Sequence, residues 1–156
     1  KDLEKVKEYE NFVVFAPGAS KETKKWTKEN FSRLGKLIND KYGHAIGDKV
    51  LIEFCFIVNS IIDDGTIFGR IGGEEFCITF FDKDIEIVEN IAEKIRNNCA
   101  NKQIILENNE ILNFTVSMGL SCRDNFDDID KILQKSDELL YEAKETGRNR
   151  LIRVHR

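Results

Sequence analysis

This sequence lacks an apolar run long enough to span a membrane, an excess of positive charge and any closely spaced cysteines. The first absence excludes a transmembrane helix within these 156 residues, and the opening residues KDLEKVKEYE do not resemble a signal peptide. The net charge of −4 argues against a general nucleic-acid-binding role, because that role needs a basic face to displace counterions from phosphates. We therefore expect neither nucleic acid nor a membrane as a partner of this domain.

The cysteines bear on the cellular compartment. They form no C-x-x-C motif and stand far apart in the chain, at Cys55, Cys77, Cys99 and Cys122. This spacing favours neither a zinc site nor a disulfide framework. We therefore expect buried free thiols and a reducing, cytoplasmic environment.

The patterns that are present indicate one α+β domain over residues 1–156. Short apolar segments predict strands at residues 11–16, 66–71, 76–81, 103–107, 112–122 and 149–156. Apolar residues at helical spacing predict helices at residues 3–9, 21–38, 47–62, 84–100 and 128–147, and Ile87, Ile91 and Ile95 mark the apolar face of the fourth. Because strands and helices alternate with hairpins, we expect one mainly antiparallel central sheet flanked by helices.

The stretch RIGGEEFCITF places two glycines and two glutamates between two strand patterns. Gly72 and Gly73 suit a hairpin turn, because glycine readily adopts positive φ. Glu74 and Glu75 would repel each other there unless a cation lay beside them, and Mg²⁺ is a suitable cation. Taken alone, the motif also fits an acidic turn that is only solvated.

Four blocks resemble, in order, the conserved elements of the GGDEF family: residues 36–51, KLINDKYGHAIGDKVL; 72–76, GGEEF; 115–121, TVSMGLS; and 136–151, SDELLYEAKETGRNRL. The resemblance implies a fold like the palm domain of nucleotide polymerases and cyclases. It implies a diguanylate cyclase that condenses two GTP into cyclic di-GMP and pyrophosphate, with Mg²⁺ or Mn²⁺ as cofactor. Since each domain of this family presents half of the reaction site, it also implies a homodimer.

The resemblance assigns roles to the turn residues. Glu74 would be the metal ligand, and Glu75, Gly72 and Gly73 would complete the catalytic turn. Metal ions held there would activate the attacking 3′-hydroxyl and stabilise the leaving pyrophosphate. The glycines would let the nucleotide approach the backbone closely.

Other residues would bind the substrate. The resemblance implies that Asn39 and Asp48 bind the guanine edge, and a carboxylate can accept both the N1–H and N2–H of guanine. An alternative for Asp48 is a helix N-cap after Gly47. Lys144 and Arg148 would bind the terminal phosphates, with Lys36 acting from the other side. The alternative for Lys144 and Arg148 is a pair of solvated cations that stabilise the helix dipole.

The sequence departs from the family pattern at a metal ligand. The family ends its first strand in D-x-D-x-F-K-x-I-N-D, and the first Asp binds metal. Counting back from Ile38 places Phe31 and Arg33 at the Asp positions, whereas aligning the strand NFVVFA places Ala16 and Pro17 at its end. Residues 17–29 form an unusual insertion, and we expect the absence of the metal-binding Asp to weaken ion binding and to slow turnover. The alternative function is an impaired GGDEF domain that binds guanine nucleotide and regulates a partner; a third is a plain dimerisation domain.

Two further elements of the family are missing. The R-x-x-D inhibitory site has Asp63 and Thr66 at its two charged positions, so we expect no inhibitory site of this type. The opening D-x-L-T-x-L-x-N-R element is also missing. Residues 1–10 read as the remnant of a leading helix, and the chain has no initiator methionine. We therefore expect a sensor or dimerising segment upstream in a longer protein.

Overall fold

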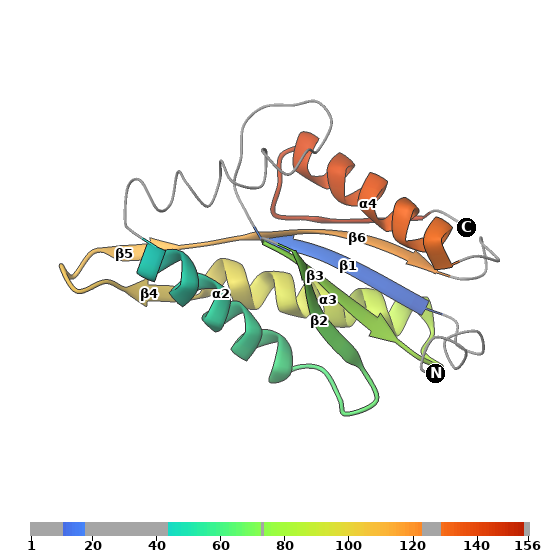
Figure 1. Ribbon diagram of the computed structural model, residues 1–156, viewed down its shortest axis with the longest axis horizontal. Coiled ribbons are helices and arrows are strands. Elements are labelled where there is room, and N and C mark those ends of the chain that lie inside the picture. Colours follow the sequence, from blue (N-terminus) through green and yellow to red (C-terminus); the bar gives the residue numbers. More distant parts are fainter. Residues whose placement is uncertain (1–10, 18–43, 73, 123–128, 155–156) are drawn as a thin grey trace.

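A five-stranded sheet forms the centre of the molecule in the computed structural model, which describes residues 11–17, 44–72, 74–122 and 129–154 (Figure 1). The strand order is β2–β3–β1–β6–β7. Its strands are β1 (Asn11–Pro17), β2 (Ile67–Gly72), β3 (Glu75–Phe80), β6 (Val116–Cys122) and β7 (Leu151–Arg153). The first three neighbouring pairs are antiparallel, and β6 and β7 are parallel. The predicted α+β class with a mainly antiparallel sheet is confirmed.

Helices cover both faces of this sheet. Helix α4 (Ile129–Glu145) lies on one face, and α2 (His44–Asn59) and α3 (Ile85–Asn101) lie on the other (Figure 1). Each of these three helices falls where a helix was predicted, although α2 begins and ends three residues earlier than the sequence pattern indicated. The predicted helices at residues 3–9 and 21–38 lie outside the described residues, as does nearly all of the 17–29 insertion.

The segment predicted as one strand at residues 112–122 is two strands in different sheets. Strand β5 (Ile111–Asn113) pairs with β4 (Gln103–Ile105) in a separate hairpin, and β6 joins the central sheet. Phe114, between β5 and β6, packs against both the main core and the small core under this hairpin. One apolar run therefore serves two cores, which the alternation of residues alone did not reveal.

The main core fills the space between the sheet and α2 and α3. Helix α3 buries a stripe at three- to four-residue steps: Ile85, Val88, Ala92, Ile95 and Cys99. The predicted face was wrong in part, because Ile87 is about half exposed. The rings of Phe54, Phe68 and Phe76 contact one another between α2 and the β2–β3 hairpin.

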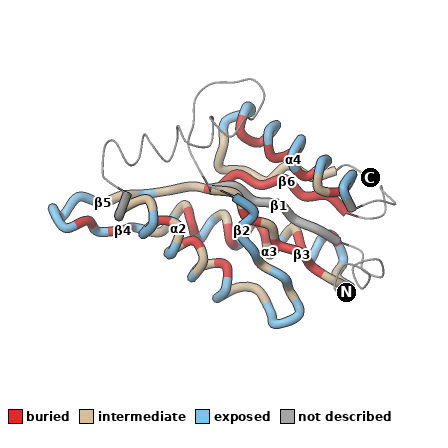
Figure 2. The backbone as a smooth tube through the Cα atoms, in the orientation of Figure 1, coloured by how far each residue is buried: buried red, intermediate tan, exposed pale blue. Residues whose placement is uncertain are grey.

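Strand β6 is buried along its whole length, as Figure 2 shows in red. It can be covered this closely because small residues face α4. Ser121 Oγ donates a hydrogen bond to the carbonyl oxygen of Ile132 at 2.9 Å, and the hydroxyls of Ser121 and Ser136 are also hydrogen-bonded to each other. These contacts fix the position of α4 on the sheet.

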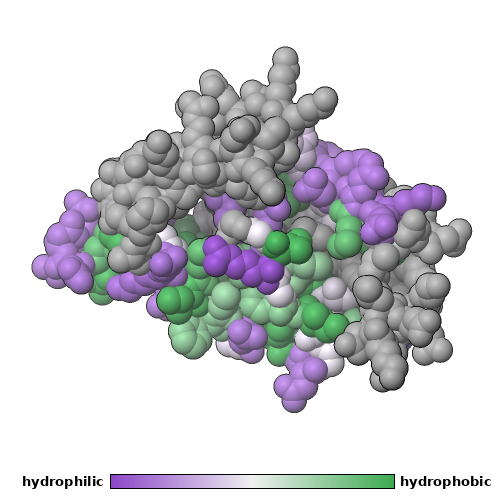
Figure 3. Space-filling model, viewed as in Figure 1, coloured by the Kyte–Doolittle hydropathy of each residue, from purple (hydrophilic) through white to green (hydrophobic). Residues whose placement is uncertain are grey.

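All four cysteines are free thiols. The predicted burial is confirmed for Cys99 and Cys122, whereas Cys55 and Cys77 are half-buried. Within the described ranges, no helix is both long and apolar enough to cross a bilayer. Hydrophobic side chains gather on the outer side of α2 and β2 (Figure 3), where the exposed residues are Ile52, Phe56, Ile67 and Ile71.

Candidate active site

The two glutamates of the motif lie at the tight turn between β2 and β3. Gly72 pairs with Glu75 across the hairpin, and Glu74 directly precedes β3; Gly73 lies outside the described residues. The predicted hairpin is confirmed. A Cβ added to Gly72 would meet no atom within 4 Å, which leaves open space beside the backbone of the turn.

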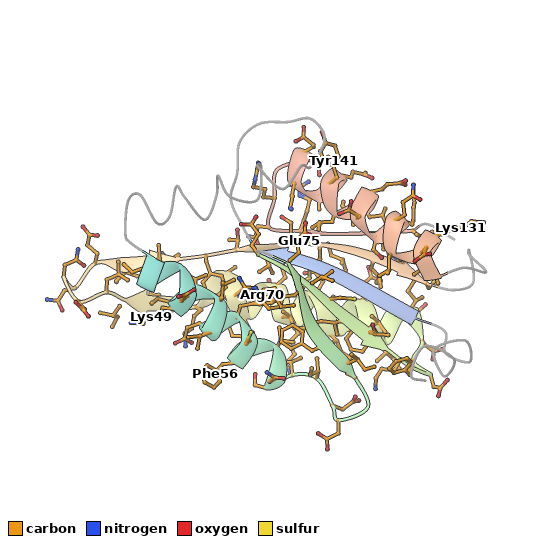
Figure 4. The ribbon with its side chains drawn as sticks, viewed as in Figure 1. Lys49, Phe56, Arg70, Glu75, Lys131 and Tyr141 are labelled. Carbon is orange, nitrogen blue, oxygen red and sulfur yellow. The ribbon has the colours of Figure 1, made fainter. Side chains whose placement is uncertain are left out.

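A lysine from the other end of the chain faces this turn. Lys144 lies in the last turn of α4, and only 7% of its surface is exposed. In Figure 4, Glu75 lies beneath the end of α4 that carries Tyr141, far from Lys131 at the other end. The charges of Glu74 and Glu75 act on Lys144, and its charge acts on both of them. The structure therefore brings together three residues predicted for the site.

Burial dominates the ionisation of this cluster. It raises the pKa of Glu74 to about 7, an effect that Lys144 opposes and Glu75 adds to. Burial likewise raises the pKa of Glu75, again opposed by Lys144. The pKa of Lys144 is lowered by burial, although the neighbouring carboxylates favour its charged form. Without a further cation, the site therefore resists full ionisation of both glutamates at neutral pH.

This burial predicts a pH dependence of stability. Because the pKa of Glu74 rises on folding from 4.5 to about 7, the folded state binds more protons than the unfolded state between these values. The proton bound by Glu74 therefore stabilises the folded state fully below pH 4.5, and this stabilisation is lost as pH rises through 7. We expect the free energy of unfolding, relative to that of Glu74→Gln, to fall by up to about 3 kcal/mol across this window.

The measurement is urea denaturation of both proteins in chelator at a series of pH values. Glu74→Gln keeps the size of the side chain and cannot ionise, so titrating groups outside the cluster cancel in the comparison. Parallel stability curves for the two proteins across this window would contradict the burial of Glu74.

Asp137 is a member of this cluster that the sequence analysis missed. It is exposed on α4, yet its charge raises the pKa of both Glu75 and Lys144. It precedes Lys144 by seven residues, which places the two on the same side of a helix two turns apart. This spacing was the signal that could have found it.

Arg148 lies in an unusual turn that follows α4. Gly147 has a φ of +122°, and the backbone N–H of Arg148 donates to the carbonyl oxygen of Ala143 at 2.9 Å, as in a Schellman C-cap. The predicted helix stop at Gly147 is confirmed. Arg148 and Asn149 follow with φ of +59° and +46°. A left-handed arginine costs about 1–2 kcal/mol, so contacts from outside the turn must hold it. The charge of Arg148 acts on Lys144, so two of the three predicted phosphate-binding residues lie at this end of α4.

Asp48, one of the two residues predicted to bind guanine, is not part of this cluster. Asp48 is exposed in the second turn of α2 and is not among the charges that act on Glu74, Glu75 or Lys144. Its alternative role as an N-cap was wrong, because α2 begins at His44. Asn39 and Lys36 lie outside the described residues.

The end of β1 lies beside the Glu74–Glu75 turn. Phe15 pairs with Phe76 on one side and with Met118 on the other, so the next residues of β1 run alongside the start of β3. The end of the strand thus holds Ala16 and Pro17, and neither residue has a side chain that can bind a metal ion. This agrees with the second of the two alignments, in which NFVVFA is the first strand.

The donor chemistry of the turn fits Mg²⁺. In the described part of the chain, no three His, Cys, Asp or Glu side chains are grouped closely enough to hold an ion by themselves. Mg²⁺, however, is commonly held by one or two carboxylates together with substrate phosphates and water. Glu74 and Glu75 supply that number of carboxylates, so they would hold an ion that arrives with a nucleotide.

Comparison with known proteins gives the family. Residues 29–150 match the family described as "Diguanylate cyclase, GGDEF domain". A diguanylate cyclase of Vibrio cholerae is 40% identical over 116 residues, which make up 74% of this chain and 35% of that protein. Diguanylate cyclase A of Treponema denticola is 39% identical over 118 residues, or 74% and 31% of the two chains. The chain spans about a third of the length of the curated relatives it matches.

Solved structures share the fold. The active GGEEF domain of a diguanylate cyclase from Vibrio cholerae is similar with a TM-score of 0.75 and 31% identity, over 99% of this chain and 88% of that one. The GGDEF domain of DgcB from Caulobacter crescentus, in complex with c-di-GMP, has a TM-score of 0.78 at 24% identity, over 97% and 81%. The expected palm-like α+β fold is confirmed. By its matching residues, its relatives and its fold, the chain belongs to the GGDEF domain family.

Proposed function

We propose that this domain is a diguanylate cyclase that binds GTP with Mg²⁺ and condenses two GTP into cyclic di-GMP and pyrophosphate. The observation that carries the proposal is the buried Lys144, which faces the Glu74–Glu75 turn from the end of α4. Taking a lysine and two carboxylates out of water is costly, and interactions with a bound ligand of complementary charge can offset part of that cost. A nucleoside triphosphate with its metal ion would supply a partner for each of these charges.

Each residue of the cluster has a role in this reaction. Lys144 and Arg148 bind the β- and γ-phosphates and so hold the α-phosphate in place for attack. Mg²⁺, when bound, would neutralise charge on the phosphates and stabilise the leaving pyrophosphate. Glu74 would be its ligand. Glu75, whose pKa is raised by burial, is suited to accept the proton of the attacking 3′-hydroxyl.

The proposal extends to partners and location. The 3′-hydroxyl comes from the GTP of a second domain, so two copies must face each other. Asn39 and Asp48 bind the guanine edge, and an exposed Asp48 is accessible for this. A sensor or dimerising segment in the full-length protein would bring two domains together in the cytoplasm.

A second function is favoured by the end of β1. With Ala16 and Pro17 beside the turn, the site has one carboxylate fewer than the family pattern. Each tenfold loss of rate corresponds to ~1.4 kcal/mol of transition-state stabilisation, and a lost metal ligand can cost several such factors. A domain impaired in this way would still bind GTP and would regulate a partner.

One experiment separates these functions. The chain is incubated with GTP and Mg²⁺ or Mn²⁺ at high protein concentration, and cyclic di-GMP is measured by chromatography. We expect product in the wild type and a decrease on the order of 100-fold or more in Glu74→Ala, because the metal loses its ligand. Saturable GTP binding without product would instead support the regulatory module, and no GTP binding would support a plain dimerisation domain.

A further inference from the structure

Arg96 is a polar residue of α3 that the proposed chemistry does not use. It is largely buried, and its guanidinium group donates in three directions. Nε donates to Glu93 Oε2 at 2.9 Å, and Nη2 donates to Asn97 Oδ1 at 2.7 Å. Nη1 donates to Asn149, both to the backbone oxygen at 3.2 Å and to Oδ1 at 2.9 Å. Arg96 thus reaches from α3 to the turn that follows α4.

That turn needs external support. Gly147, Arg148 and Asn149 all have positive φ, and only glycine adopts such a conformation without strain. Asparagine tolerates it more readily than arginine does. One local contact lies within the turn, where Arg150 Nε donates to the carbonyl oxygen of Arg148 at 3.2 Å. Without contacts that fix it, the backbone of Arg148 would relax toward negative φ, and its side chain would then point elsewhere.

The described contacts hold the turn from three sides. On the side of α4, the N–H of Arg148 donates to the carbonyl oxygen of Ala143 at 2.9 Å. On the side of the sheet, the N–H of Met118 donates to the carbonyl oxygen of Arg150 at 2.9 Å. On the side of α3, Arg96 binds the backbone and the side chain of Asn149 together. Because Nη1 of Arg96 donates to both of these groups, it fixes the orientation of Asn149 as well as its position.

Glu93 and Asn97 make Arg96 a rigid support. Each accepts from a different nitrogen of the guanidinium group, so the planar group has a single orientation when it meets Asn149. Lysine at this position would keep the charge near Glu93, but its single nitrogen could not reach Glu93, Asn97 and Asn149 from the three fixed directions of the planar guanidinium group.

From this arrangement we infer that Arg96 is a positioning residue for the phosphate-binding Arg148, acting through Asn149. The inference rests on the proposed function, because it assumes that Arg148 binds the terminal phosphates of GTP. It predicts that Arg96 affects recognition of the triphosphate and leaves recognition of the guanine and the first phosphate unchanged.

The test compares the affinities of GTP and GMP, measured calorimetrically with Mg²⁺, for wild type, Arg96→Gln and Arg96→Lys. We expect both variants to bind GTP on the order of 10-fold more weakly, because a misplaced binding group loses most of its contacts with the ligand. Their affinity for GMP should stay close to that of the wild type. Arg96→Lys serves as the second variant should Arg96→Gln fail to fold.

The matched control is Arg153→Gln. Arg153 also links α3 to the end of the chain, through an ion pair of 3.2 Å with Glu89, but it lies in β7 beyond the turn. This variant should bind both nucleotides like the wild type. The same loss of GTP affinity in Arg153→Gln would show that any link between α3 and the chain end has this effect, and would overturn the inference.

A double variant tests whether Arg96 acts through Arg148. Arg148→Ala should weaken GTP binding, and adding Arg96→Gln should weaken it little further, because the group being positioned is already absent. The inference would be overturned if the losses in the double variant multiply as for independent residues. It would also be overturned if the Arg96 variants lose GTP and GMP affinity equally, or if both of them bind GTP like the wild type. If the wild type itself fails to bind GTP, the proposed function falls and this inference falls with it; the wild-type measurement thus tells the two failures apart.

Discussion

Replacing Gly119 by alanine is expected to lower the free energy of unfolding by about 3 kcal/mol or more, because overpacking against backbone is among the costlier core substitutions. A Cβ at this position of β6 would lie 2.1 Å from the carbonyl oxygen of Ser136 and 2.5 Å from the backbone nitrogen of Leu140. Both atoms belong to the backbone of α4, so no side chain can turn aside. The helix would have to move away from the sheet.

The matched control for this prediction is Gly69→Ala in β2. A Cβ at Gly69 would meet no atom within 4 Å, and its φ does not lie in the left-handed region. Replacing glycine at such a site changes stability by less than about 1 kcal/mol, in the stabilising direction when the unfolded chain loses freedom. Urea denaturation of the two variants measures the contrast. Equal midpoints for Gly119→Ala and wild type would mean that α4 is not seated on β6 as described.

The regular elements were predictable because their signals are local. The pattern of α4 and the stop at Gly147 are visible within a few turns of helix, and the two glycines mark the hairpin that carries Glu74. The buried face of α3 was harder to predict, because one apolar stripe begins at Ile85 and another at Ile87. Only packing against the sheet shows that the stripe from Ile85 is the buried one. Local periodicity thus determined where the helices form and left open how they pack.

Residues of the site that belong to a sequence motif were predictable. Residues that join the site only through tertiary contacts were not. Lys144 and Glu74 were identified from the GGDEF resemblance, whereas their mutual burial comes from α4 crossing the sheet. Asp137 was missed, although its seven-residue spacing from Lys144 was visible. Arg96 gave no signal, because its partner Asn149 lies 53 residues away and an arginine on an amphipathic helix usually faces solvent.

Replacing Lys144 by methionine is expected to have the largest effect on activity. Methionine has a similar length and suits a buried site, so it removes the charge without leaving a cavity. Under the proposed function, the site would lose a cation that binds phosphate, and formation of cyclic di-GMP should fall by on the order of 100-fold or more, as when one donor that stabilises a transition state is removed. Because the charge of Lys144 lowers the pKa of Glu74, that pKa should also rise above its present value of about 7.

The same substitution elsewhere on the helix distinguishes this effect from a general effect on α4. Lys131 is exposed near the start of α4, far from Glu75 in Figure 4, so Lys131→Met should leave product formation and the titration of Glu74 unchanged.

The further rise in the pKa of Glu74 in Lys144→Met has a consequence for folding. The folded protein would keep the proton on Glu74 to a higher pH, and its stability would decline over a wider pH range. Urea denaturation of Lys144→Met across pH 6 to about 8 in chelator measures this decline. If Lys144→Met forms product at the wild-type rate, Lys144 balances the charge of the turn without touching the substrate, and the phosphate-binding role has to be assigned elsewhere.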